Sequence, residues 1–208
     1  MNIFPRKEIL TDQQTELLSL VKKFKEEFIL VGETAIALHL GHRRSIDFDL
    51  FSQEEFGNKK IRNAIIGEGW NIEMVFRDEK DCFTLLINGV QVTFFYYPFQ
   101  IHAKEDFGEA KVPDLLTLGA MKAYALGRRA KWKDYVDLCF IFQKHGSVKP
   151  VIDEAKNIFK NEFNENLFRK QLAYFEDINY EEQVDFLSGF EVSKEEVKKK
   201  LTDFAIDA

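Results

Sequence analysis

The chain has 208 residues, of which 45% are hydrophobic and 31% are charged, and its formal net charge is -6. This length and composition are typical of a globular protein with one or two domains. The net acidic charge argues against a protein whose whole surface binds nucleic acid, although it leaves room for a local basic groove.

The first predicted elements are a helix, a strand and a shorter helix. Residues 11–28 have apolar side chains at helical spacing and open on a Thr-Asp-Gln-Gln capping signal. Residues 28–31 are an apolar run that predicts a buried strand, and Gly32 ends it. Residues 34–40 predict a second helix, with Gly41 as its C-cap. A glycine turn that enters a helix in this way presents backbone N–H groups to a phosphate.

Two carboxylates follow in the next predicted strand, residues 46–51. Asp47 and Asp49 alternate with apolar residues, which is typical of a half-buried strand and places both acids on one face, about 7 Å apart. Such a pair can bind Mg²⁺ and share it with substrate phosphates. The alternative is that the two acids lie on the solvent face of an edge strand. The apolar residues on the other face are Ile46, Phe48 and Leu50.

The remaining sequence divides into a mixed part and a helical part. Residues 53–68 predict a helix whose inward residues are Phe56, Ile61, Ile65 and Ile66. Strands are predicted at residues 71–76, 82–87 and 90–97, with Asn88-Gly89 as a type I′ hairpin turn. Helices are predicted at residues 111–129, 131–144, 151–175 and 193–204. The sequence therefore predicts an α+β chain with a mixed α/β domain at residues 1–105 and a helical region at residues 106–208.

A second group of charged residues lies in the stretch KAYALGRRAKWKDYVD, residues 122–137. Its cations could bind a triphosphate or an RNA backbone, and Asp134 and Asp137 share one helical face. The alternative is a solvated basic helix with its own salt bridges. The cations are Lys122, Arg128, Arg129, Lys131 and Lys133. His39 lies in an apolar helical segment, which favours a packed residue over a catalytic one.

The cysteines and the N-terminal sequence indicate the cellular compartment. Cys82 and Cys139 belong to no CxxC pair, which argues against a zinc site or a disulfide framework. The N-terminus lacks the apolar core of a signal peptide, and no window approaches the roughly 18 consecutive apolar residues of a membrane span. We therefore expect a reduced, cytoplasmic protein without membrane contact.

The two charged stretches together resemble a known family. Residues 32–51, GETAIALHLGHRRSIDFDLF, are similar to the signature of the AbiEii/AbiGii-type nucleotidyltransferases, members of the minimal nucleotidyltransferase (DNA polymerase β-like) superfamily. The family pattern is Gly-Gly-Thr-Ala followed by Arg-x-Ser-x-Asp-hydrophobic-Asp-hydrophobic. A downstream family motif, a Lys on one helix and Arg…Lys-Asp-x-x-Asp-Leu on the next, is similar to Lys122 and residues 129–138. The resemblance covers about residues 28–140.

The resemblance implies a fold and a set of roles. The fold is a mixed β-sheet flanked by helices, followed by a helical region that closes the active-site cleft. Asp47 and Asp49 would hold Mg²⁺, and Asp134 would position or activate the acceptor, with Asp137 supporting its helix. The residues implied in binding the NTP are Gly32, Thr34, Arg44, Ser45, Lys122 and Arg129. The implied catalysis rests on positioning and charge neutralisation.

The resemblance also implies a reaction and its partners. The reaction is transfer of a nucleotide from an NTP to an RNA, including tRNA, or to a protein acceptor. Family members of known role are toxins of bacterial toxin–antitoxin or abortive-infection systems, so a cognate antitoxin is an expected partner.

This chain departs from the family pattern in two places. Glu33 stands where the pattern has its second glycine, and its carboxylate could either repel a triphosphate or serve as a capping charge at the helix N-terminus. A third metal-binding acid, expected near Thr93 in the strand at residues 90–97, is not evident. Both departures leave a second hypothesis open, a catalytically degenerate protein that binds nucleotides or partners. A more distant hypothesis is a helical interaction protein whose C-terminal part holds an antitoxin.

Overall fold

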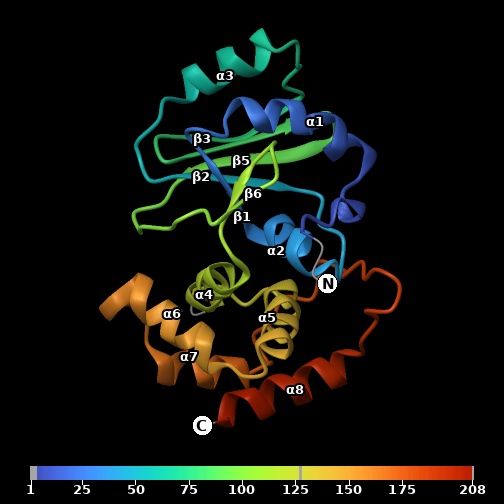
Figure 1. Ribbon diagram of the computed structural model, residues 1–208, viewed down its shortest axis with the longest axis vertical. Coiled ribbons are helices and arrows are strands. Elements are labelled where there is room, and N and C mark those ends of the chain that lie inside the picture. The colour runs from blue at the N-terminus through green and yellow to red at the C-terminus, as the bar shows by residue number, and fades with distance from the viewer. Residues whose placement is uncertain (1–3, 127, 208) are drawn as a thin grey trace. The chain divides into compact units, whose positions relative to one another are not determined.

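The computed structural model describes residues 4–126 and 128–207 (Figure 1). The chain divides into two compact units, Met1–Asp114 and Leu115–Ala208. Residues 1–3, which begin the N-terminal stretch compared above with a signal peptide, lie outside the described residues. So does Gly127, which falls within the predicted helix at residues 111–129.

The first unit is built around a mixed β-sheet. Its elements in chain order are η1 (Lys7–Ile9), α1 (Asp12–Lys23), β1 (Ile29–Val31), α2 (Gly32–Leu40), β2 (Phe48–Ser52), α3 (Asn58–Gly67), β3 (Met74–Glu79), β4 (Cys82–Ile87), β5 (Val90–Tyr96), β6 (Glu105–Asp106) and β7 (Lys111–Val112). Within the described residues, five strands form one sheet in the order β1-β2-β5-β4-β3, and β6 pairs with β7. The predicted mixed α/β fold class is confirmed.

Strand β2 lies inside the sheet. It pairs antiparallel with β1 and parallel with β5. Asp49 therefore belongs to an interior strand. The alternative placed the two acids on an edge strand, and that placement is wrong.

Helices α1 and α3 cover the same face of this sheet (Figure 1). Phe24 at the end of α1 packs against Phe94 of β5, with the ring centroids 4.9 Å apart. Arg62 of α3 lies 5.2 Å from the ring centroid of Phe83 in β4. Phe83 and Phe94 are cross-strand partners and share a face.

Several local predictions are confirmed. Thr11 and Gln14 form the predicted capping box at the start of α1. Gly41 ends α2 in the left-handed conformation, with φ of 66°. Asn88 and Gly89 have φ of 53° and 70°, and a type I′ turn needs positive φ at both positions.

The predicted strand that carries the acids starts too early. Pairing with β5 begins at Phe48 and not at residue 46. The segment before it is held instead by Thr34, whose hydroxyl donates to the carbonyl of Asp47. As a result Ile46 is 60% exposed rather than in the core, and Asp47 precedes the strand.

Other predicted ends in this unit are also displaced. α1 ends at Lys23 rather than at residue 28, α3 starts at Asn58 rather than at residue 53, and β3 spans 74–79 rather than 71–76. Ile66, assigned to the core of α3, is 59% exposed. Apolar spacing identifies an element, but turns and caps set its ends. The pairing of β3 with β4 also changes register between Val75 and Arg77.

The second unit is helical. Its elements are α4 (Leu115–Leu126), α5 (Trp132–His145), α6 (Lys149–Phe159), η2 (Lys160–Glu162), α7 (Glu165–Leu172) and α8 (Lys194–Ile206). α4 packs against α5, α6 and α7, and α8 packs against α5 and α7. Fully buried side chains at the centre of this unit include Tyr135, Phe142 and Phe159.

Two predicted helices are wrong in extent. The helix predicted from residue 111 starts at Leu115, because Lys111–Val112 pair with Glu105–Asp106 as a short β-ladder in the first unit. The helix predicted over residues 151–175 is interrupted at Lys160, whose φ is 50°. Asn164 then caps the separate helix α7 by accepting a hydrogen bond from the Leu167 N–H.

No helix among the described residues is long and apolar enough to cross a membrane. Cys82 and Cys139 are free thiols, and burial raises the pKa of the Cys139 thiol to about 11.

Candidate functional site

The carboxylate of Asp49 lies directly against Gly32. Val31 and Asp49 are partners in the β1–β2 ladder, so the first residue of α2 follows immediately beside the acid. Gly32 has φ of 71°, and a Cβ at this position would come within 2.2 Å of Oδ2 of Asp49. Only glycine allows both the backbone conformation and the close approach. The sequence therefore places a partly exposed acid at the N-terminus of a helix, where backbone N–H groups collect.

Thr34 joins the first turn of α2 to the segment before β2. Its Oγ1 lies 2.9 Å from Oγ of Ser45 and 2.5 Å from the carbonyl oxygen of Asp47. Thr34 and Ser45 are both buried, at 1% and 6% exposure. Their hydroxyls therefore hold the loop that carries Asp47, which is a positioning role.

Glu33 and Arg43 form an ion pair that the sequence did not reveal. Nη2 of Arg43 donates to Oε2 of Glu33 at 2.9 Å, and Nη1 donates to the carbonyl of Arg44 at 3.0 Å. The Arg43 side chain is fully buried, whereas that of Glu33 is 20% exposed. The sequence signal for this pair was two opposite charges ten residues apart. That spacing alone does not show that the two side chains meet. The Glu33 carboxylate thus has a cation beside it.

The opposite face of the sheet from α1 and α3 carries Asp49. It pairs with Thr93 of β5, and Thr93 pairs with Thr84 of β4, so the three side chains share one row. The position where a third acid was expected lies beside Asp49 and holds a threonine. Among the described residues, no group of three or more His, Cys, Asp or Glu side chains could hold a metal ion. Any metal bound at this site would take the rest of its ligands from substrate or water.

In the second unit, Lys122 lies between two aspartates. Its Nζ pairs with Asp134 and lies 3.1 Å from Oδ2 of Asp137. Lys122 is 4% exposed and both acids are fully buried. The i, i+3 spacing on α5 turns both carboxylates toward the same side of α4. The sequence predicted these residues as a group, and the structure brings them together.

Arg129 completes this second group. It donates to both carboxylate oxygens of Asp134, at 3.0 and 3.2 Å. Its side chain is 48% exposed, so it is the accessible cation of the two that contact Asp134. We call Lys122, Arg129, Asp134 and Asp137 the lysine–aspartate cluster.

The segment after α7 braces the loop that carries Arg129. The N–H of Trp132 donates to the carbonyl of Asn179, and the N–H of Asn179 donates to the carbonyl of Ala130. Glu182 binds both Lys131 and Lys133, at 2.8 and 2.9 Å. Hydrogen bonds from these two lysines lower the pKa of Glu182 to about 2.

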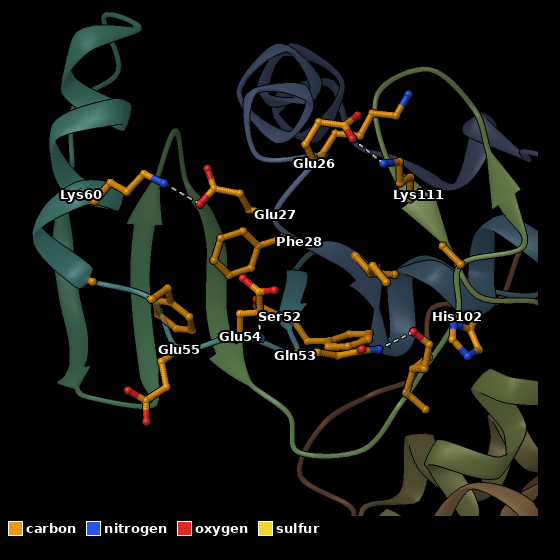
Figure 2. A pocket seen from close by; sticks show the side chains of 17 residues that line it. Glu26, Glu27, Phe28, Ser52, Gln53, Glu54, Glu55, Lys60, His102 and Lys111 are labelled. Carbon is orange, nitrogen blue, oxygen red and sulfur yellow. Dashed lines mark hydrogen bonds and ion pairs between the residues drawn. The ribbon is translucent and has the colours of Figure 1, made fainter.

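A pocket of about 690 Å³ lies in the first unit, at the other end of β1 and β2 from Asp49. Figure 2 shows its wall, where Glu26 pairs with Lys111 and Glu27 pairs with Lys60, each at 2.6 Å. No residue assigned to nucleotide or metal binding from the sequence lines it. Because these charged groups are paired with one another, size alone does not make the pocket a site for a charged substrate.

His39 has a structural role. Its Nε2 lies 2.9 Å from the carbonyl oxygen of Pro113, and its ring stacks on Phe4 with the centroids 4.5 Å apart. Burial lowers its pKa. These contacts agree with the predicted packed role.

The chain was compared with known protein families, sequences and structures. No protein-family profile matches the chain. An uncharacterized protein of Aquifex aeolicus is 29% identical over 185 residues, which cover 86% of this chain and 88% of that protein.

Three solved structures have a similar fold. The nucleotidyltransferase toxin MenT4 of Mycobacterium tuberculosis has a TM-score of 0.59 and 14% identity, covering 93% of this chain and 80% of MenT4. JHP933 of Helicobacter pylori has a TM-score of 0.56 and 16% identity over 94% and 91% of the two chains. Another H. pylori structure, named as a putative nucleotidyltransferase, has a TM-score of 0.57 and 14% identity over 93% and 92% of the two chains. The chain therefore has a nucleotidyltransferase fold.

Proposed function

We propose that this protein is a nucleotidyltransferase that moves a nucleotide from an NTP to an acceptor. The observation that carries the proposal is the close approach of Asp49 to Gly32 at the start of α2. Within a nucleotidyltransferase fold, this places a carboxylate beside backbone N–H groups that can receive phosphates. The residues assigned to the NTP are Gly32, Thr34, Arg44 and Ser45 in the first unit, with Lys122 and Arg129 in the second.

Asp47 and Asp49 are proposed to hold Mg²⁺. Two carboxylates fit this ion, which takes oxygen ligands and is commonly held by one or two acids together with substrate phosphates and water. Bound there, Mg²⁺ would neutralise charge on the phosphates. Asp49, fixed against Gly32, supplies a preformed ligand. Thr34 holds the main chain of Asp47 in place.

The lysine–aspartate cluster is proposed to serve the same reaction. Lys122 and Arg129 would meet the triphosphate, and Asp134 would position the acceptor hydroxyl or accept its proton. The acceptor oxygen forms a bond to the α-phosphorus, the bond from the α-phosphorus to the bridging oxygen breaks, and pyrophosphate leaves. Arg129, being half exposed, can exchange Asp134 for a phosphate at smaller cost than buried Lys122.

The proposed acceptor is RNA, including tRNA, or protein. Similarity to MenT4, which is named as a toxin, supports a role as the toxin of a bacterial toxin–antitoxin or abortive-infection system. The AbiEii-type signature supports the same role. A cognate antitoxin and a cytoplasmic location belong to this proposal.

Calorimetric titration tests the proposed site before any acceptor is known. Each of the four NTPs is titrated with Mg²⁺ into wild-type protein, and at least one should bind with Kd in the roughly micromolar to millimolar range of enzyme substrates. Asp49→Asn should abolish that binding. Glu54→Gln, the same chemical change in the wall of the pocket of Figure 2, should leave it unchanged. Binding lost in Glu54→Gln and kept in Asp49→Asn would move the site to the pocket.

A catalytically degenerate protein is the second candidate. Thr93 at the position beside Asp49 favours it, because a threonine hydroxyl is a weaker metal ligand than a carboxylate. This candidate predicts nucleotide binding without transfer of label to any macromolecule. If no NTP binds at all, a protein-binding role remains.

A further inference from the structure

We propose that Glu33 and Arg43 form a positioning pair that holds residues 43–47 on the first turn of α2. The inference rests on the proposed function, since it concerns the loop assigned to NTP phosphates and Mg²⁺. It gives a role to a residue that departs from the family pattern and to an arginine assigned no role from the sequence.

The pair is part of a continuous set of contacts. Three consecutive residues at the start of α2 each contact the segment that runs from residue 43 to residue 49. Gly32 lies against Asp49, Glu33 binds Arg43, and Thr34 binds Ser45 and the Asp47 carbonyl. Glu33 and Arg43 contribute an ionic contact to this set.

Burial makes the contact costly to break. The Arg43 side chain is fully buried, so bulk water does not solvate its charge. The nearby Glu33 carboxylate stabilises that charge instead. Through its other terminal nitrogen, Arg43 holds the carbonyl of Arg44 at 3.0 Å. One guanidinium thus fixes the main chain just before Ser45 while its charge is balanced from α2. A single planar group can do both because it has several donors in fixed directions.

The pairing with Arg43 also explains how the Glu33 carboxylate can occupy a turn assigned to phosphate binding. An unpaired Glu33 would add a negative charge beside Asp49 and oppose a triphosphate. The Arg43 cation beside it offsets this negative charge. Glu33 is therefore compatible with an anionic substrate. Its loss should weaken phosphate binding because residues 43–47 would no longer be held on α2.

Two measurements on four proteins test the pair: wild type, Glu33→Gln, Glu33→Asp and Glu27→Gln. Glu27→Gln is the matched control, because Glu27 pairs with Lys60 at 2.6 Å on an exposed surface. The first measurement is amide hydrogen exchange of the protein without nucleotide. Glu33→Gln should speed exchange of peptides covering residues 41–47 by about tenfold, because the buried Arg43 charge loses the carboxylate that links it to α2. Peptides of the β4–β5 hairpin should be unchanged, and Glu27→Gln should match wild type throughout.

The second measurement is calorimetric affinity for an NTP and for the matching nucleoside, with Mg²⁺. Glu33→Gln should weaken NTP binding by about tenfold, because displaced phosphate contacts are costly, while the nucleoside affinity stays within about twofold. A purely structural role would lower both affinities together. Glu33→Asp keeps the charge on a shorter side chain and should fall between wild type and Glu33→Gln in both measurements, even if Glu33→Gln folds poorly.

The outcomes separate this inference from the proposed function. Unchanged exchange at residues 41–47 in Glu33→Gln and Glu33→Asp overturns the positioning pair, whatever binds. Faster exchange with NTP binding equal to wild type, or tighter, also overturns it. Faster exchange in a protein whose wild type binds no NTP supports the pair as a brace of the loop and overturns the proposed function.

Discussion

The acids of the two units are held in opposite ways. In the first unit, Asp47 and Asp49 are partly exposed, and Asp49 is placed by a glycine backbone. In the second unit, Asp134 and Asp137 are fully buried and share Lys122. We infer that the first pair is open to a ligand as it stands, whereas the second pair, besides its proposed part in the reaction, also stabilises its helices. Substitutions can test this comparison.

We expect the largest effect from Lys122→Met, which should lower the stability of the folded protein. This substitution leaves two buried carboxylates without their shared cation and should lower the free energy of unfolding by about 3–5 kcal/mol. Asp49→Asn should cost at most about 1 kcal/mol, the size of a charge–helix contribution. Urea denaturation of both variants measures the contrast. Equal losses would remove the distinction between the two pairs of acids.

Gly32→Ala should separate backbone strain from loss of the site. A residue other than glycine at this φ costs about 1–2 kcal/mol, and the added Cβ must also displace the Asp49 carboxylate. We expect that cost together with loss of NTP binding. Gly89→Ala is the matched control, because its φ is 70° and a Cβ there meets nothing within 4 Å. It should cost about the same through strain and bind NTP as wild type does. Normal binding by Gly32→Ala would show that the close approach to Asp49 is not needed.

Arg129→Gln should have an intermediate effect. It removes two hydrogen bonds to Asp134, but the side chain is half exposed, so we expect a loss of about 1 kcal/mol. The neighbouring Arg128 lies 3.9 Å from Glu162 at the surface, and Arg128→Gln should change stability by less than about 0.5 kcal/mol. Thermal unfolding compares the two variants. A larger loss in Arg128→Gln would contradict the structural role given to Arg129.

The smallest expected effect is the pH dependence that comes from Glu182. Its pKa is about 2 in the folded protein and 4.5 as the ordinary value, so the depressed pKa contributes stability above pH 4.5. That contribution is lost as pH falls from 4.5 toward 2. Because the carboxylate is half exposed, screening keeps the effect small. Glu182→Gln should be less stable than wild type at pH 6, and the difference should shrink at pH 3. A difference that grows on acidification would contradict the role of this carboxylate.

The sequence predicted the kinds of element better than their ends. The capping box at Thr11 and the turn at Asn88-Gly89 were predictable because short-range hydrogen bonds and positive φ depend on a few neighbouring residues. The start of β2 was not predictable, because a tertiary hydrogen bond from Thr34 holds the residues before it.

The same limit applies to the candidate site. Lys122, Asp134 and Asp137 could be grouped from the sequence, since helical spacing places the two acids on one face. The ion pair of Glu33 with Arg43 could not, because it depends on how the turn after α2 folds back. The role of Gly32 was expected from its turn, but its contact with Asp49 required the register of β1 on β2.

Transfer of label from NTP tests the central claim most directly. Each of the four NTPs, labelled at the α-phosphate, is incubated with Mg²⁺, total cell extract and either wild-type protein or Asp47→Ala. The account predicts that wild type labels an RNA or protein with at least one NTP, and that Asp47→Ala labels nothing above background. Equal labelling by Asp47→Ala would contradict the assignment of this site.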